Sequence, residues 1–413
     1  MKTREYWPVN WVDGMKINKS HFQQQEANLN EQIALTQSAT LKDYRYGLLP
    51  SSANYGGLDL VVTPERVEVR RCQAITRAGY LLVVGPENNA ELQRRMSDLM
   101  YGRDFSEADT WHVVLRIQPG ERTGIGSPNP EEIPLRQPFA CTKVHLEIVP
   151  AIDLARADSM THGLPLARII KTYQGIERDR EFIPPVVRVD VSEQLLHHHH
   201  QWKEQLLATE GDHFEIIRKI KDKHRNNQGN QLSADLLSLS HACIRYINEH
   251  FDAYRLLLPQ GEPILLFNWF MALARTIRNE VRLAGNQENM LNYLAHFIDG
   301  VAATDLMRFC NDLCDCDYHH SDIHHLVTQV NNFMGFVSRL FSQIRQLDYH
   351  EIATPTIINN RSYGRMDTGH PAQPIRPTVR PAGSSLRITT RNATRDSSQD
   401  NHGGDTDGGW GLK

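Results

Sequence analysis

Cysteine is scarce in this chain, with six thiols among 413 residues. So few cysteines cannot form the dense disulfide network of small secreted domains, and they are typical of a reducing compartment. Long apolar runs are also missing: the longest, residues 263–274, is interrupted by Asn268 and falls short of the ~20 residues that cross a bilayer. The first 20 residues include Arg4 and Asp13 and lack the apolar core of a signal peptide. We therefore expect a cytoplasmic protein without a membrane span.

A surplus of one charge is absent as well, because 45 Lys and Arg face 49 Asp and Glu, a net charge of −4. Such a chain has no overall positive field to attract nucleic acid or an anionic membrane, and we expect neither as a partner. Its 40% of hydrophobic residues can bury a core over most of the length. A chain of 413 residues predicts two to three domains, since one domain usually takes about 100–200 residues.

The common catalytic and cofactor motifs are missing too. The sequence contains no G-x-S-x-G elbow, no G-x-G-x-x-G after a strand, no phosphate-binding loop ending in Gly-Lys-Ser/Thr and no H-E-x-x-H. We therefore predict that the protein is not an enzyme, and that it has no catalytic residues and no cofactor.

One segment is rich in metal-binding side chains, namely Cys310, Cys314, Cys316 and the histidines at 319, 320, 324 and 325. A C-x-C pair within a helix directs its thiols to opposite faces, and the C-x2-C knuckle of common zinc sites is absent. Buried cysteine also packs as a small hydrophobe, so we predict packing at a helix–helix corner and no metal site. A zinc centre, and with it a metalloenzyme, is the alternative.

For the internal run His197–His200 we predict a solvated helix face.

Residues 1–19 are predicted to form an extended arm, because Pro8 and the turn pair Asp13-Gly14 precede any helical period. A helix then begins, for which Ser20 is the predicted N-cap and Gln23 its partner in a capping box. One face of this helix is predicted to be apolar, because side chains follow a roughly 3.6-residue spacing at Phe22, Leu29, Ile33, Leu41 and Tyr44.

Between about residues 57 and 191 apolar side chains alternate with polar ones, which predicts strands. Turn-forming stretches at 118–120 and 127–130 separate these strands, and short strands at this spacing indicate a β-sandwich or barrel. A short helix is predicted around residues 89–99. The alternating sets are Val67/Val69, Trp111/Val113/Leu115/Ile117 and Val144/Leu146/Ile148.

From Ser192 to about His350 the pattern becomes helical, so we place a domain boundary between residues 191 and 192. Apolar seams with alternating steps of four and three residues run through 236–258, 266–281 and 323–344. Ser321 is the predicted N-cap of the helix that contains the last seam. Such seams belong to helices packed nearly parallel in a bundle, and they can be shared between subunits. We predict a trimer seam that includes Leu236, Ile247, Phe251, Val330 and Val337.

The last segment, residues 351–413, is rich in Gly, Pro and Arg and has little apolar periodicity. Seven Arg lie with a single acid, Asp367, within residues 361–395, and several acids follow. Only residues 385–390 have the pattern of a strand. We predict a flexible, charge-segregated tail that binds protein and not nucleic acid.

The N-terminal segment carries a family resemblance. Val9, Trp11, Gly14 and Met15, followed by the run His21-Phe22-Gln23-Gln24-Gln25, resemble the opening signature of the type VI secretion baseplate subunit TssK. That signature reads Val-x-Trp-x-Glu-Gly-Met and then Pro-Gln-His-Phe-Gln-Gln-Gln. Here Asp13 stands for the usual Glu, and Lys19-Ser20 replace Pro-Gln. Two later segments, 164–169 and 182–185, resemble further family landmarks.

The resemblance implies an α+β multidomain protein: a phage-like β-sandwich shell domain over residues 1–191, a helical bundle neck over 192–350 and the tail over 351–413. It also implies a homotrimeric baseplate adaptor that joins a wedge of the TssF/TssG type to the membrane-side complex, at the cytoplasmic face of the inner membrane. The residues predicted to bind the partner are Trp11, Met15, His21, Phe22 and Gln25. For Trp11 and Met15 the alternative is packing within their own domain.

The C-terminus departs from the family pattern. Family members usually end in a compact head domain that docks on the membrane complex, whereas here the Gly/Pro/Arg-rich tail follows the helices. We therefore expect the C-terminal region to reach a membrane-complex or other anchor protein in a different way. A phage-derived receptor-binding or tail protein shares the layout of strands followed by a bundle, and is the alternative function.

Overall fold

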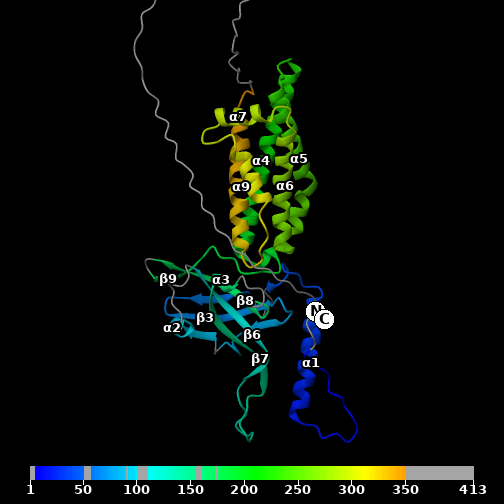
Figure 1. The fold of residues 1–413 in the computed structure, drawn as a ribbon, viewed down its shortest axis with the longest axis vertical. Helices are drawn as coiled ribbons and strands as arrows, with labels where there is room; N and C mark the ends of the chain where they lie inside the picture. Colours follow the sequence, from blue (N-terminus) through cyan, green and yellow to red (C-terminus); the bar gives the residue numbers. More distant parts are fainter. Residues whose placement is uncertain are drawn as a thin grey trace, which may run out of the picture. The chain divides into compact units, whose positions relative to one another are not determined.

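The computed structural model describes residues 5–50, 57–89, 92–100, 110–154, 160–172 and 175–349, and all of these belong to one compact unit. Strands lie within the first half of the chain and helices dominate the second, so the fold is mixed α+β (Figure 1). The predicted tail, residues 351–413, lies outside the described residues.

The first helix, α1 (Lys19–Ser38), begins earlier than predicted. Its N-cap is Asn18, whose side chain accepts the N–H of His21, while the His21 ring accepts the N–H of Asn18. The prediction of Ser20 with Gln23 was therefore wrong, because Asn is as good a cap as Ser and a His at the third position closes the box in place of Gln. The helix also ends before Leu41 and Tyr44, so these two do not belong to its apolar face.

Five strands form the first antiparallel sheet, in which the long β3 is the common partner of the others. The predicted alternation is confirmed there, since Val67 and Val69 are fully buried on β3. The predicted helix around 89–99 is wrong in part: residues 93–95 pair with β3 as a strand, and the α-helix α2 covers Met96–Leu99. The strands are β1 (Gly47–Leu48), β2 (Asp59–Val62), β3 (Arg66–Ile75), β4 (Leu81–Val84) and β5 (Gln93–Arg95).

The second sheet has the order β7-β6-β8-β9 and is also antiparallel. Trp111, Val113, Leu115 and Ile117 are buried on β6, but His112 and Val114 between them are buried too, so the predicted alternation with exposed polar positions is wrong over residues 111–115. Both faces of this strand are covered there, since Val114 packs in a second, small cluster with Val149 and Met160. The predicted turn at 118–120 is instead a bulge within β6, where Gly120 supplies a positive φ and the register shifts. The elements are β6 (Thr110–Ile125), β7 (Phe139–Pro150), the short helix α3 (Ala151–Leu154), β8 (Gly163–Thr172) and β9 (Gly175–Arg178).

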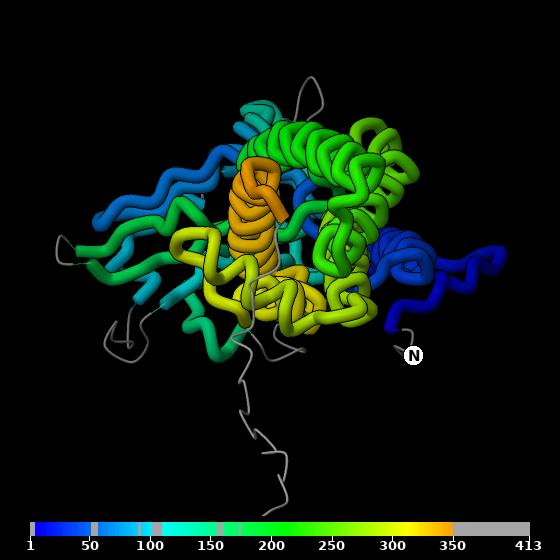
Figure 2. Tube along the Cα trace, turned by 90° about the horizontal axis from the view of Figure 1, so that it is seen from above, coloured from blue at the N-terminus to red at the C-terminus, as the bar shows by residue number. Residues whose placement is uncertain are grey.

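Five helices after the strands contact one another in a ring, α4 to α5, α6, α8, α9 and back to α4. Figure 2 looks onto their ends and shows α9, in orange, beside α4, in green. The bounds are α4 (Glu193–Arg225), α5 (Gln231–Leu256), α6 (Pro263–Leu283), α7 (Gln287–Phe297), α8 (Asp305–Cys314) and α9 (Ile323–Ile344), with 3-10 turns at Val189–Val191 and Leu258–Gln260. The side chains inside the ring belong to the same hydrophobic cluster as those of the strands.

Two predictions about helix surfaces are corrected. The residue before α9 is Asp322 and makes no side-chain cap, so the predicted cap at Ser321 was wrong. Within His197–His200, His199 is buried, with its Nε2 3.1 Å from the carbonyl oxygen of Tyr254 and its ring stacked on the Tyr254 ring. The predicted solvated face was wrong for His199, because α4 turns this position toward α5.

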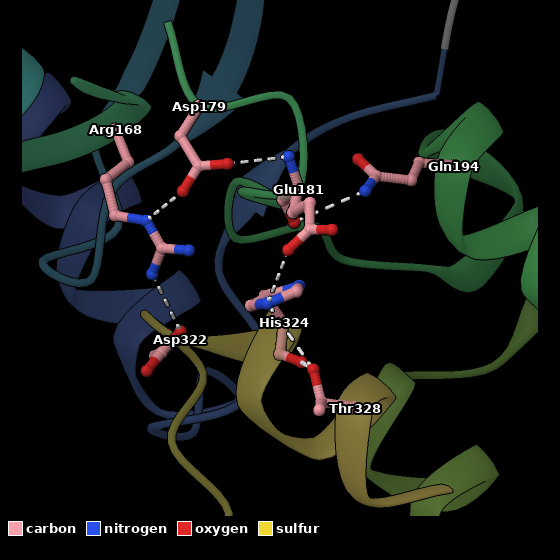
Figure 3. A network of polar contacts seen from close by, with 7 residues as sticks. All are labelled: Arg168, Asp179, Glu181, Gln194, Asp322, His324 and Thr328. Atoms are coloured by element: carbon pink, nitrogen blue, oxygen red, sulfur yellow. Dashed lines mark hydrogen bonds and ion pairs between the residues drawn. The ribbon is translucent and has the colours of Figure 1, made fainter. Parts of the chain in front are cut away.

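A polar network joins the end of the second sheet to the start of α9 (Figure 3). Arg168 on β8 donates through Nε to Asp179 over 2.7 Å, and its Nη1 lies 3.8 Å from Asp322. In the first turn of α9 the His324 Nε2 lies 3.4 Å from the Glu181 carboxylate. These contacts fix the strand end against the base of the bundle.

Candidate partner-binding surface

The N-terminal arm folds back along α1 and is held there by side chains of the helix. The N–H groups of Glu5 and Tyr6 each donate to the Glu31 carboxylate over 2.9 Å, and Asn28 donates to the Tyr6 carbonyl over 2.8 Å. Nearer the helix start, Gln24 donates to the Trp7 carbonyl and the Gln25 side chain accepts the N–H of Val9, each over 3.2 Å. Residues 24, 25, 28 and 31 lie on one helix face, which we call the polar ladder.

The polar ladder faces the arm, and three apolar side chains elsewhere on α1 remain exposed. Phe22 is 60% exposed, Leu29 is 49% exposed and Ile33 is 57% exposed. The arm adds exposed apolar side chains of its own. We call the arm and α1 together the hairpin. We define the arm–helix surface as its large, exposed hydrophobic residues: Trp7, Trp11, Val12, Ile17, Phe22, Leu29 and Ile33.

An aromatic group forms the part of this surface nearest the start of α1. The Trp11 ring lies 6.1 Å from the His21 ring, edge-on, and 6.3 Å from the Phe22 ring. Both distances are within the range of favourable aromatic pairs. The turn predicted at Asp13-Gly14 is confirmed: the Met15 N–H donates to the Val12 carbonyl over 3.2 Å, and Gly14 has a φ of 76°.

The structure brings together three of the five residues predicted to bind a partner. Trp11, His21 and Phe22 are in ring contact, while Met15 is half-buried in the turn and Gln25 holds the arm backbone. Sequence reasoning missed the polar ladder residues Gln24, Asn28 and Glu31. Their spacing of four and three residues, opposite the apolar stripe, is the signal that could have identified them.

The hairpin is attached to the sheets at Arg122 and at Gly79. Glu26 forms an ion pair of 2.7 Å with Arg122 on β6. At Gly79, before β4, a Cβ atom would lie 2.5 Å from the Ala34 carbonyl oxygen, so the α1 backbone approaches as closely as glycine allows. Between these points a cavity of about 920 Å³ is lined by Trp7 and Ile33 together with Tyr80 and Leu81. The arm–helix surface is therefore carried on a supported hairpin.

The residues predicted for the trimer seam lie elsewhere, within the bundle. Leu236, Ile247, Val330 and Val337 are buried inside a single chain. Phe251 is only partly buried, and its ring stacks on Tyr254 at 6.2 Å. A trimer contact through these five residues stays a prediction.

The cysteine-rich segment has the environment of packed thiols. Burial raises the pKa of Cys310 to about 12, whereas a metal ligand must be a thiolate. The Cys314 thiol donates to the Met271 carbonyl at 3.6 Å, and Cys316 lies beyond the end of α8, so the C-x-C pair is not within one helix as assumed. Among the residues with described positions, no group of three or more His, Cys, Asp or Glu is placed to hold a metal ion.

In the same ranges no helix has the length and apolar character to cross a membrane.

No protein-family model matches the sequence, and no curated protein matches it. Solved structures do. The chain is similar to TssK. A crystal structure of TssK shares 14% identity over 84% of this chain and 71% of that one, with a TM-score of 0.48. TssK from the type VI secretion system of EAEC, in complex with nanobody nb18, shares 16% identity over 78% and 99%, with a TM-score of 0.43. A chain of the baseplate complex from the type VI secretion system shares 16% identity over 80% and 100%, with a TM-score of 0.48.

Proposed function

We propose that this chain is a structural component of a type VI secretion baseplate, and that its arm–helix surface binds a wedge protein of the TssF/TssG type. The observation that carries the proposal is the exposure of Trp7, Trp11 and Phe22 on one supported hairpin. Residues 9–25, which resemble the TssK signature, form the larger part of the same hairpin and indicate the class of partner.

Physical chemistry favours an interface at this surface. Contiguous exposed apolar side chains are uncommon on soluble proteins and mark sites of association, and tryptophan is among the residues that contribute most to binding. The polar ladder holds the arm before any partner arrives. Binding therefore avoids much of the cost of ordering a loose segment, which is about 0.5–1.5 kcal/mol for each immobilised side chain.

The wider assembly is part of the proposal. We propose a homotrimeric adaptor with a phage-like β-sandwich shell over residues 1–191, a bundle over 192–350 as the trimerising neck, and a tail over 351–413 that reaches an anchor protein on the membrane side, in the cytoplasm. Since four of the five seam residues are buried within one chain, contact between copies must also use exposed side chains. Leu207 and Phe214, 44% and 53% exposed and seven residues apart on α4, are suited to this contact.

Co-purification tests the wedge contact directly. The chain would be expressed with the TssF- and TssG-type proteins of its own system, as wild type and as Trp11→Ser with Phe22→Ser. We expect the double variant to lose the wedge proteins, because two aromatic anchors of an interface together contribute about 2 kcal/mol or more. Leu283→Ser is the matched control, since it removes an exposed apolar side chain at the far end of α6. Equal recovery from the double variant and the control would contradict the proposal.

A further inference from the structure

The described chain continues beyond α9 in residues 345–349, which we call the strap. Arg345 at its start pairs with the buried Asp212 of α4 over 2.9 Å. Tyr349 at its end is 1% exposed and belongs to the hydrophobic core, and Leu347 packs against that core. The strap is therefore part of the folded body.

Two lysines of α4 bind the backbone of the strap. The Lys219 ammonium donates to the Leu347 carbonyl and lies 3.5 Å from the Asp348 carboxylate. The Lys223 ammonium donates to the Asp348 carbonyl. The two lysines are four residues apart in the last two turns of α4, so they lie on one face of the helix. Because hydrogen bonds from a charged donor are roughly twice as strong as neutral ones, this face holds the strap firmly.

Tyr349 connects three helices. Its hydroxyl donates to the carbonyl of Ile344, the last residue of α9, over 2.9 Å. Its own carbonyl accepts the side-chain N–H of Asn230, the N-cap of α5, over 3.0 Å. The ammonium groups of Lys219 and Lys223 lie 5.4 and 5.8 Å from the centre of the Tyr349 ring, within the range of cation–π contacts. One side chain thus meets α4, α5 and α9.

The backbone of Tyr349 is in the left-handed region, with a φ of 52°. A bulky residue rarely takes this conformation, because its Cβ atom then crowds the backbone. Such a residue keeps it only where the surrounding structure fixes it. The contacts of the ring, the hydroxyl and the carbonyl together meet this condition, so Tyr349 is locked in place.

We propose that the strap is an anchor that ties the tail, residues 351–413, to α4 and α5. Since the backbone and the ring of the strap are bound by these two helices, a pull on the tail reaches them through Tyr349 before it reaches the last turn of α9. The strap also covers part of the hydrophobic core, which withdrawal of Tyr349 and Leu347 would expose. The anchor is a property of this chain and does not depend on the partner proposed for the tail.

Hydrogen exchange of the full chain tests the anchor without any partner. The reporters are the N–H groups of Gln346 and Leu347, which donate to carbonyls of α9. In Lys219→Met with Lys223→Met the apolar stems remain and both donors are lost, so we expect these two N–H groups to exchange about tenfold faster or more.

Lys203→Met with Lys221→Met is the matched control for this experiment. These lysines lie on the same helix and, within the described ranges, form no hydrogen bond or ion pair with the strap. We expect exchange at Gln346 and Leu347 to match wild type. Equal exchange in the two double variants would overturn the anchor.

Single-molecule pulling measures the mechanical role. The full chain would be held at Lys413 and at a click-reactive amino acid in place of the exposed Glu204 on α4. In wild type we expect the strap to stay bound until the bundle unfolds. In Tyr349→Ala we expect an earlier step at lower force that lengthens the chain by roughly 17 Å, since five released residues span about 3.4 Å each.

Two further variants make the pulling experiment decisive. Tyr349→Phe keeps the ring and loses one hydrogen bond, so the early step should occur at an intermediate force. Tyr254→Ala removes another fully buried tyrosine of the bundle, and it should lower the unfolding force without adding the early step. An early step in wild type, or one in Tyr254→Ala as readily as in Tyr349→Ala, would contradict the anchor.

Discussion

The Glu31 carboxylate on α1 accepts the backbone N–H of Tyr6, 25 residues earlier in the chain, over 2.9 Å. A buried carboxylate is thus used to hold an extended arm, and with it Trp7 and Trp11, in a fixed position. This contact orients the arm–helix surface.

Replacing Glu31 should release the arm without unfolding the protein. Glu31→Ala removes the acceptor for two N–H groups, and losing such hydrogen bonds costs about 1–3 kcal/mol locally. We expect faster hydrogen exchange at residues 5–9, an unchanged melting temperature and weaker wedge binding. Gln32→Ala, at an exposed neighbouring position, is the control. Unchanged exchange in Glu31→Ala would show that the hydrogen bonds to Glu31 are not needed to hold the arm.

Deleting residues 1–18 should abolish wedge binding and leave the oligomer intact, because the helical bundle is formed by residues far along the chain. Analytical ultracentrifugation gives the mass, and co-purification gives the binding. The deletion also exposes Asn28 and Glu31, which are polar and can be solvated. A drop in mass to the monomer would place the arm in the contact between copies.

Two neighbouring substitutions in the bundle should differ sharply. Ile247 is 2% exposed, so Ile247→Asp buries an unpaired carboxylate at a cost of several kcal/mol, comparable with the whole stability of a marginal domain. Phe251 is partly accessible, so Phe251→Asp can turn toward water and should cost less. Chemical denaturation measures both. If Phe251→Asp instead dissociates a trimer without unfolding the chain, Phe251 belongs to the seam.

His213 should make the protein less stable in acid. Burial against Phe341 lowers its pKa from 6.5 to about 3, so the folded chain cannot take up the proton that the unfolded chain binds below pH 6.5. Its stabilising contribution is full above pH 6.5 and is lost as the pH falls toward 3, at up to about 1.4 kcal/mol per pH unit. His213→Leu should therefore lose less stability than wild type between pH 7 and pH 5. The exposed His200→Leu is the control, and equal pH profiles for all three chains would contradict the assignment.

A chain that ends at His350 should melt like the full chain, because residues 361–395 carry seven Arg and almost no apolar surface to bury. We expect the shortened chain to lose attachment to an acidic anchor protein. For the full chain we expect this attachment to weaken with added salt, because the screening length falls from about 8 Å at physiological ionic strength to about 3 Å at 1 M. Calorimetry and salt-dependent co-purification measure these effects. Aggregation of the shortened chain would mean that the tail is needed for folding.

Periodicity in the sequence was enough to predict the local structure of many segments. Alternation at Val67 and Val69 predicted β3, and steps of three and four residues predicted α5, α6 and α9, because side-chain spacing follows directly from the pitch of each element. The family resemblance of residues 9–25 was likewise present in the order of the residues. Helix starts were less predictable: Asn18 and Ser20 can both cap, and the structure uses Asn18 with His21 as its partner.

What the sequence could not determine is which face of an element meets another element. The stripe of Phe22, Leu29 and Ile33 has the pattern of a buried face, yet it is exposed because Asn28 and Glu31 bind the backbone of the arm. His199 is buried beside exposed His200 because α5 covers one side of α4. Such contacts join residues 22 to 55 positions apart, so only the tertiary structure, in which distant backbone groups find their hydrogen-bond partners, decided where the candidate surface lies.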